Sequence, residues 1–193
     1  MTALSSDSTL SGHDVTLKTP PFLVMSVQRF VLLYVVTMGF YSTVWFYLQW
    51  KQYRKATGVK VLPALRAFLG VFMVFSLFRK IDNGLKASGL NHRWFPITRG
   101  VSIVVLVMLL TLGTFIPVEY GDTLWVMALN YICAGIVVFL FAGVQRAINV
   151  LGGDIEGKSN ADLTLANGLW MGFFGCVWVL FFIGLYTLLM PSY

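Results

Sequence analysis

The sequence has few charged residues and few of the side chains that most often carry catalysis. Of its 193 residues only 11% are charged and 58% are hydrophobic, and there are two histidines and two cysteines. A typical soluble domain is about 25% charged. So little charge excludes an ordinary soluble fold, because such a fold could not remove this much apolar surface from water. We expect an all-α, polytopic integral membrane protein.

Three stretches contain no charge at all, namely residues 100–118, 123–145 and 163–193. Each is long enough for a helix to cross a hydrocarbon core of about 30 Å. Two further apolar segments are less regular. We expect about four transmembrane helices and one short re-entrant or interfacial helical segment. The expected spans are 22–48, 101–118, 123–144 and 169–190, the short segment is 62–78, and all belong to a single membrane domain, 22–193.

The segment 62–78 is a poor span because Arg66 and Arg79 bracket its apolar centre. The residues between them cover about 18 Å at 1.5 Å per residue. If both of its flanks stay on one side, nearly all lysines and arginines fall on that side, as the positive-inside rule predicts for cytoplasmic loops. We then expect both termini outside. Arg29 and Gly39 interrupt the first segment, which leaves a bend or a folded-back hairpin open.

The remaining composition gives weaker information. Residues 1–21 are polar and lack the basic start and apolar core of a secretory signal, so we expect a flexible tail. Cys133 and Cys176 fall within apolar spans, where a small buried thiol is the usual role. The net charge of +6 is explained by membrane orientation, and nucleic-acid binding is not expected.

A basic and aromatic segment follows the first apolar stretch. Lys51, Arg54 and Lys55 share one helical face, and Trp45 and Trp50 suit the boundary between lipid and water. With Arg66 and Arg79, these residues predict contact with lipid or a partner protein. An interfacial anchor and a surface selective for anionic headgroups both remain open at this point.

The same region resembles a family of small, uncharacterised bacterial multi-pass membrane proteins with the motif T-x-G-x-Y-x-x-x-W-F-Y-x-x-W. The matching residues are Thr37, Gly39, Tyr41, Trp45, Phe46, Tyr47 and Trp50. Residues 63–81 and 145–149 (QRAIN) resemble later family elements, whereas Val44 stands where the family usually has another aromatic residue. The resemblance implies a bacterial cytoplasmic (inner) membrane and implies no activity.

Two features of the later spans favour helix packing. Gly168 and Gly172 form a GxxxG pattern that Gly175 extends by one turn, and small residues let helices approach closely in lipid. The packing partner is either another helix of the same chain or a second copy. Asn130 lies inside the expected span 123–144, and we expect it to hydrogen-bond across helices, to Thr111, Thr114 or Ser76.

Signatures of an enzyme are sparse. The sequence has no paired carboxylates or histidine pairs at metal-ligand spacing, so we expect no catalytic residues, no metal and no cofactor. The sequence favours a non-enzymatic protein that acts through contacts of its basic cytoplasmic face with membrane lipids, anionic ones among them, or with a membrane-protein partner or a second copy. A small transporter or channel is the alternative. A lipid-modifying enzyme, which would depend on Asp82 and His92, is the third.

Overall fold

The computed structural model describes residues 20–115 and 123–189, which form helices and loops and no β-strand. The all-α class is therefore confirmed. The expected tail lies outside the described residues except for Pro20 and Pro21. The elements are α1 (Val27–Val36), α2 (Tyr41–Thr57), α3 (Pro63–Phe68), α4 (Gly70–Ala87), α5 (Pro96–Gly113), α6 (Thr123–Leu151), the short 3-10 helix η2 (Lys158–Asn160) and α7 (Leu165–Leu189).

The first apolar segment is a helical hairpin and not the single span expected over 22–48. Met38 and Gly39 both have positive φ (50° and 87°), and this turn ends α1. The hydroxyl of Thr37 donates to Leu33 O (2.7 Å) and accepts from the amide of Tyr41 (2.9 Å), so it links the two helices. At about 1.5 Å per residue α1 is roughly 15 Å long, about half of a hydrocarbon core.

The two helices of this first hairpin run antiparallel. The ring of Phe30 packs against Tyr41 and Trp45, at centroid distances of 6.1 and 5.7 Å. Further from the turn, the ring of Phe22 stacks on that of Tyr53 at 5.4 Å. The folded-back form that the sequence left open is therefore the one observed.

The segment 62–78 is divided between α3 and α4. The guanidinium of Arg66 lies 4.2 Å from the ring centroid of Trp50, and Gly70 lies close to Phe46, so α3 runs antiparallel to α2. Beyond Leu69 the chain turns back, and α4 brings Lys80 within 3.0 Å of Tyr53 OH. We call α3 and α4 the second hairpin. Neither helix is long and apolar enough to cross a membrane.

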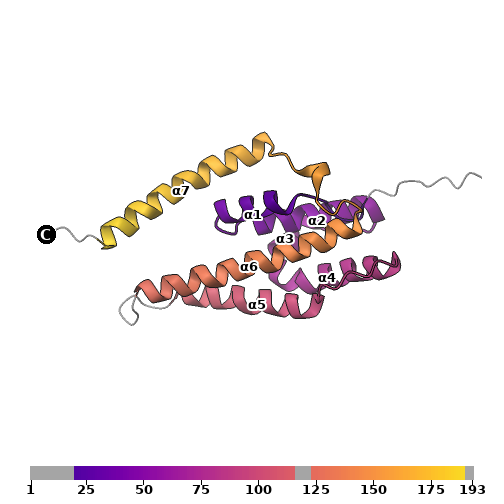
Figure 1. Cartoon of the computed structure of the whole chain (residues 1–193), viewed down its shortest axis with the longest axis horizontal. Helices are drawn as coiled ribbons and strands as arrows, with labels where there is room; N and C mark the ends of the chain where they lie inside the picture. Colours follow the sequence, from indigo (N-terminus) through magenta and orange to yellow (C-terminus); the bar gives the residue numbers. More distant parts are fainter. Residues whose placement is uncertain (1–19, 116–122, 190–193) are drawn as a thin grey trace, which may run out of the picture.

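Three helices are long and apolar enough to cross a membrane, over Pro96–Gly113, Trp125–Leu151 and Leu165–Thr187. They correspond to three of the four expected spans and support a membrane protein. Figure 1 shows α5 and α6 side by side along the long axis, whereas α7 diverges from them. The remaining expected span, 22–48, forms the first hairpin together with the rest of α2.

The core lies at one end of these long helices. Among the residues whose burial is described, those buried in α6 are all Val137 or later, those buried in α5 are Gly100 and Ile103, and the one buried in α7 is Phe174. Both hairpins pack around this end (Figure 1). We call it the basic end, because α2, α4 and the loop after α6 bring their lysines and arginines there, and we call the other the opposite end. Cys133 is partly exposed and Cys176 is exposed, so neither is the buried thiol expected.

Candidate functional site

The basic end contains a hollow of about 510 Å³ between the second half of α2 and the start of α3. Lys51, Arg54 and Lys55 line one wall, as their shared helical face predicts. The remaining lining residues are an aromatic residue of α2 and three apolar residues before and in α3, namely Tyr47, Leu62, Pro63 and Ala64. A cationic wall facing an apolar wall can hold a phosphate group that carries hydrocarbon chains.

The electrostatics of this hollow are uniformly positive. Within the described ranges, 20–115 and 123–189, two ion pairs form, Lys86 with Asp82 and Lys158 with Glu156. Neither pair involves a residue that lines the hollow. All three cations of the hollow are exposed. Three neighbouring cations repel one another, and a bound anion would relieve that repulsion.

The two predicted arginines of the second hairpin lie apart from each other. Arg66 stacks on Trp50 beside the hollow, and within the described part of the chain its buried Nη1 has no hydrogen-bond partner. Arg79 lines a smaller hollow of about 140 Å³ with Phe75, Phe78, Asp82, Pro96 and Ile97. The structure therefore brings Arg66 against α2, the helix that carries the three cations, whereas Arg79 lines a different hollow.

Trp45 and Trp50 are not surface residues. Both are fully buried, and Trp45 donates its Nε1–H to Gln145 Oε1 at 2.7 Å. In this conformation neither ring contacts lipid or a partner directly, which corrects the interfacial position expected for them. Their role is to hold α2 against α6 and under Arg66, and so to position the cations on the outer face of α2.

A polar site that the sequence analysis missed lies behind α2. Residues 20–26, which we call the strap, run without helical structure between α2, α6 and the loop after α6. The side-chain amide of Gln49 forms hydrogen bonds with both backbone groups of Leu23: its oxygen accepts from Leu23 N (2.9 Å), and its nitrogen donates to Leu23 O (3.2 Å). Asn149 bonds Met25 in the same way: its Oδ1 accepts from Met25 N (3.3 Å), and its Nδ2 donates to Met25 O (2.9 Å).

The side-chain amides that hold the strap also bond to one another. Gln145 donates to Leu23 O (3.1 Å) and to Asn149 Oδ1 (2.8 Å), and its own oxygen accepts from Trp45. Gln49, Gln145 and Asn149 are all 0% exposed. We call these three residues, with Asn160, the amide clamp. Buried polar groups satisfied in this way fix a single arrangement, because an unpaired buried group would cost about 1–3 kcal/mol.

The loop after α6 closes the clamp. Asn160 donates to Val24 O (3.1 Å), and its backbone carbonyl accepts from Ser26 N (3.3 Å) and from Arg29 Nη1 (3.2 Å). Arg29 also bonds the Asn160 side chain. Arg29 thus joins α1 to the basic end, a role that the sequence analysis did not assign to it.

A sequence signal for the clamp existed. Gln145 and Asn149 are four residues apart and share a helical face in an apolar segment, where isolated amides usually have buried partners. What the sequence could not supply was the partner, because the strap lies 124 residues away from Asn149. The groups that these amides bond are backbone groups of the strap, and every residue has such groups, so no side-chain pattern in the sequence identifies them as partners.

Of the predicted helix-packing residues, the three glycines of α7 have no inter-helix partner among the described residues, whereas Asn130 lies close to Gly113 of α5. A Cβ added at Gly168, Gly172 or Gly175 would meet nothing within 4 Å. Packing of this glycine face within the chain is therefore not observed. Asn130 donates to Val126 O of its own helix (2.9 Å), and not to the threonines or the serine that were expected to receive it.

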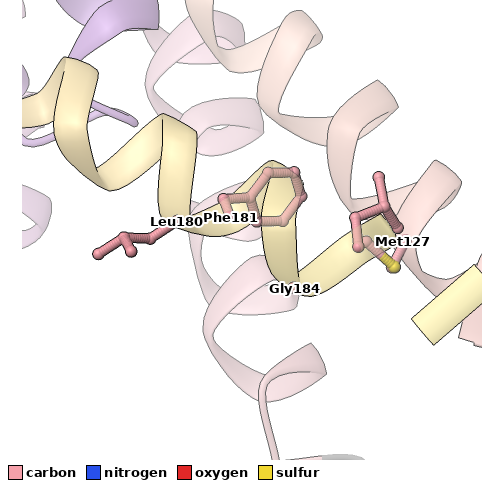
Figure 2. Close-up of a pocket in the computed structure, with 5 residues that line it drawn as sticks. Met127, Leu180, Phe181 and Gly184 are labelled. Atoms are coloured by element: carbon pink, nitrogen blue, oxygen red, sulfur yellow. The ribbon is translucent and has the colours of Figure 1, made fainter. Parts of the chain in front are cut away.

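Near the opposite end, α6 and α7 leave an apolar hollow of about 280 Å³. Figure 2 shows Met127 facing Phe181 and Gly184 across it, with Leu180 pointing away along α7. No polar side chain lines the hollow, so its chemistry is limited to apolar contact, as with a lipid chain.

Comparison of the chain with protein-family models, with curated proteins and with solved structures found no match. Within the described ranges, no group of three or more histidine, cysteine, aspartate or glutamate side chains is placed to hold a metal ion. The basic hollow is therefore the best-defined candidate site that the geometry offers.

Proposed function

We propose that this protein is a non-enzymatic, multi-pass protein of a bacterial inner membrane that binds the headgroups of anionic phospholipids at its basic end. The observation that carries this proposal is the hollow lined by Lys51, Arg54 and Lys55 and faced by Leu62. Each lysine or arginine near an anionic surface contributes about 1 kcal/mol of attraction. The apolar wall accounts for a lipid in preference to a free phosphate.

The orientation follows from the hairpins. Because each hairpin returns to the end from which it started, only α5, α6 and α7 cross the membrane in this proposal. Residues 20–26 then lie on the same side as the basic end, and the end of α7 lies on the other side. This arrangement replaces the four-span topology with both termini outside, and it satisfies the positive-inside rule more fully, since Arg29 joins the cytoplasmic side.

The proposal is tested by the lipid that remains bound after purification in mild detergent. The variant Lys51→Gln, Arg54→Gln, Lys55→Gln should lose most of the phosphatidylglycerol or cardiolipin that mass spectrometry finds with the native protein. A matched control, Lys86→Gln, Arg93→Gln, Lys158→Gln, removes three other cations of the basic end. It should keep most of that lipid.

Two outcomes would contradict the proposal. If the variant with Lys51, Arg54 and Lys55 replaced, which we call the hollow variant, retains the same amount of lipid as the native protein, the hollow does not bind that lipid. Equal loss from both variants would show that net charge alone attracts lipid and that the hollow has no special role. Both variants should keep the fold, because all six substituted side chains are exposed and none belongs to the core.

A further inference from the structure

The depth of the first hairpin can be measured against the long helices beside it. At its tip, Trp178 of α7 donates to Val36 O (2.9 Å), and the ring of Phe40 lies 5.5 Å from that of Phe174. At about 1.5 Å per residue, Phe174 is roughly 14 Å from the start of α7. The tip is therefore level with about the middle of a hydrocarbon core of about 30 Å.

The second hairpin stops at a similar level. Its turn residues Gly70 and Val71 share a small hollow with Ile103 of α5 and Phe141 of α6. Ile103 lies about 10 Å from the start of α5, and Phe141 lies about 15 Å from the end of α6. Neither hairpin reaches the part of α6 before Val137, where no described residue is buried.

The tips are suited to hydrocarbon. Phe40 at the first tip is 68% exposed, and Phe68 and Phe72 at the second are 84% and 77% exposed. In water three such rings would form an unfavourable surface, whereas among acyl chains they need no protein partner. The bases of both hairpins, in contrast, contain the lysines and arginines of the basic end.

The cross-section of the molecule therefore differs between its two halves. All seven α-helices contribute to the half at the basic end, whereas only α5, α6 and α7 continue into the opposite half (Figure 1). For helices about 10 Å across, four additional helices roughly double the area that the protein occupies in one leaflet. A body wider in one leaflet fits best where that leaflet is expanded, which is the convex side of a curved membrane.

We propose that the protein is a one-leaflet wedge that favours membranes convex toward its basic end. Its partner in this role is a curved lipid surface, and the preference arises from shape and not from charge. This inference rests on the three-span orientation proposed above, but it does not depend on the basic hollow.

The test uses the full chain with Cys133→Ser, Cys176→Ser and Thr57→Cys, reconstituted in phosphatidylcholine, which carries no net charge. An impermeant thiol reagent then reports the fraction of molecules whose basic end faces outward. That fraction should be larger in small sonicated vesicles than in large extruded ones, because only the small vesicles have a strongly convex outer leaflet. Equal fractions in the two preparations would overturn the wedge.

The same preparation carries two controls. Adding Lys51→Gln, Arg54→Gln and Lys55→Gln should leave the dependence on vesicle size unchanged, and loss of that dependence would show that charge, and not shape, orients the protein. With Phe40→Cys or Phe72→Cys in place of Thr57→Cys, the thiol should be protected in intact vesicles of both sizes. Labelling of either tip would show that it does not end inside the bilayer, and the wedge would be wrong.

These outcomes separate the two proposals. If labelling does not depend on vesicle size while the hollow variant still loses phosphatidylglycerol, the wedge fails and the lipid site stands. If labelling depends on vesicle size while lipid retention is unchanged by the hollow variant, the shape argument stands without the site.

Discussion

Different interactions stabilise the basic half and the opposite half of this molecule. The basic half contains nearly all buried side chains, together with a network of amide groups bonded to the strap. In the opposite half, α5, α6 and α7 expose large apolar residues, and a Cβ added at Gly135 of α6 or Gly184 of α7 would meet nothing within 4 Å. Where water is near, the chain needs a closed and specific core. Within lipid, exposed apolar side chains carry no penalty, because the solvent is equally apolar.

The two halves should differ most in their response to the loss of one side-chain amide. Asn149→Leu should lower the free energy of unfolding by about 4 kcal/mol, because it leaves both the amide and the carbonyl of Met25 buried without partners. Asn130→Leu, in the opposite half, should change it by less than about 1 kcal/mol, since its donor bonds only a carbonyl of its own helix. Unfolding in detergent with increasing SDS measures both. Similar losses would show that the two halves are not held differently.

A second pair of substitutions tests how closely the loop after α6 fits the strap. Gly157 and Gly153 both have positive φ (69° and 75°), but a Cβ at Gly157 would overlap the backbone of Met25, whereas one at Gly153 meets nothing within 4 Å. Gly153→Ala should cost about 1 kcal/mol for backbone strain alone, and Gly157→Ala about 3 kcal/mol. The same unfolding assay applies, and equal costs would mean that the loop does not press on the strap.

Two glycines within the long helices should differ in the sign of the stability change that an alanine causes, and both changes should be small. A Cβ at Gly143 would overlap the guanidinium of Arg99, which bonds Leu140 O at 3.1 Å, whereas one at Gly172 has open space. Gly143→Ala should therefore destabilise by about 1 kcal/mol, and Gly172→Ala should be neutral or slightly stabilising, since alanine is the better helix former. Destabilisation by Gly172→Ala would instead reveal a partner that packs on α7.

The smallest expected effect is a dependence on pH in the loop that carries Asn160. The carboxylate of Asp154 accepts from the amides of Ser159 (2.9 Å) and Lys158 (3.1 Å), and these bonds hold its pKa below the usual value of 3.8. A lowered folded pKa contributes stability that is fully present above pH 3.8 and is lost as the pH falls through the folded value. The protection of the Ser159 amide from hydrogen exchange, relative to its intrinsic exchange rate at each pH, should fall over that range, and in Asp154→Ala it should already be low at neutral pH.

The all-α class and three of the apolar helices could be predicted because both follow from composition over long windows. The first span could not be placed correctly. Its break depends on Thr37 and on the positive φ of Met38, and the long apolar run around them outweighed these local signals. The cations of the hollow were found because they share one helical face. Trp45 and Trp50 were misplaced because a tryptophan in an apolar segment suits the core as well as the lipid interface.

The strap also constrains how the protein can be made. Met25 is synthesised early, but Asn149, which holds it, follows 124 residues later, and Asn160 follows later still. At about 5–20 residues per second, roughly 6–25 seconds pass between translation of the two partners. During that interval the first hairpin exists without its clamp, and the exposed backbone of the strap must stay hydrated at the membrane surface. Any nascent chain that is released before the loop at Asn160 emerges keeps its N-terminal segment unfastened, so this loop completes the assembly of the basic end.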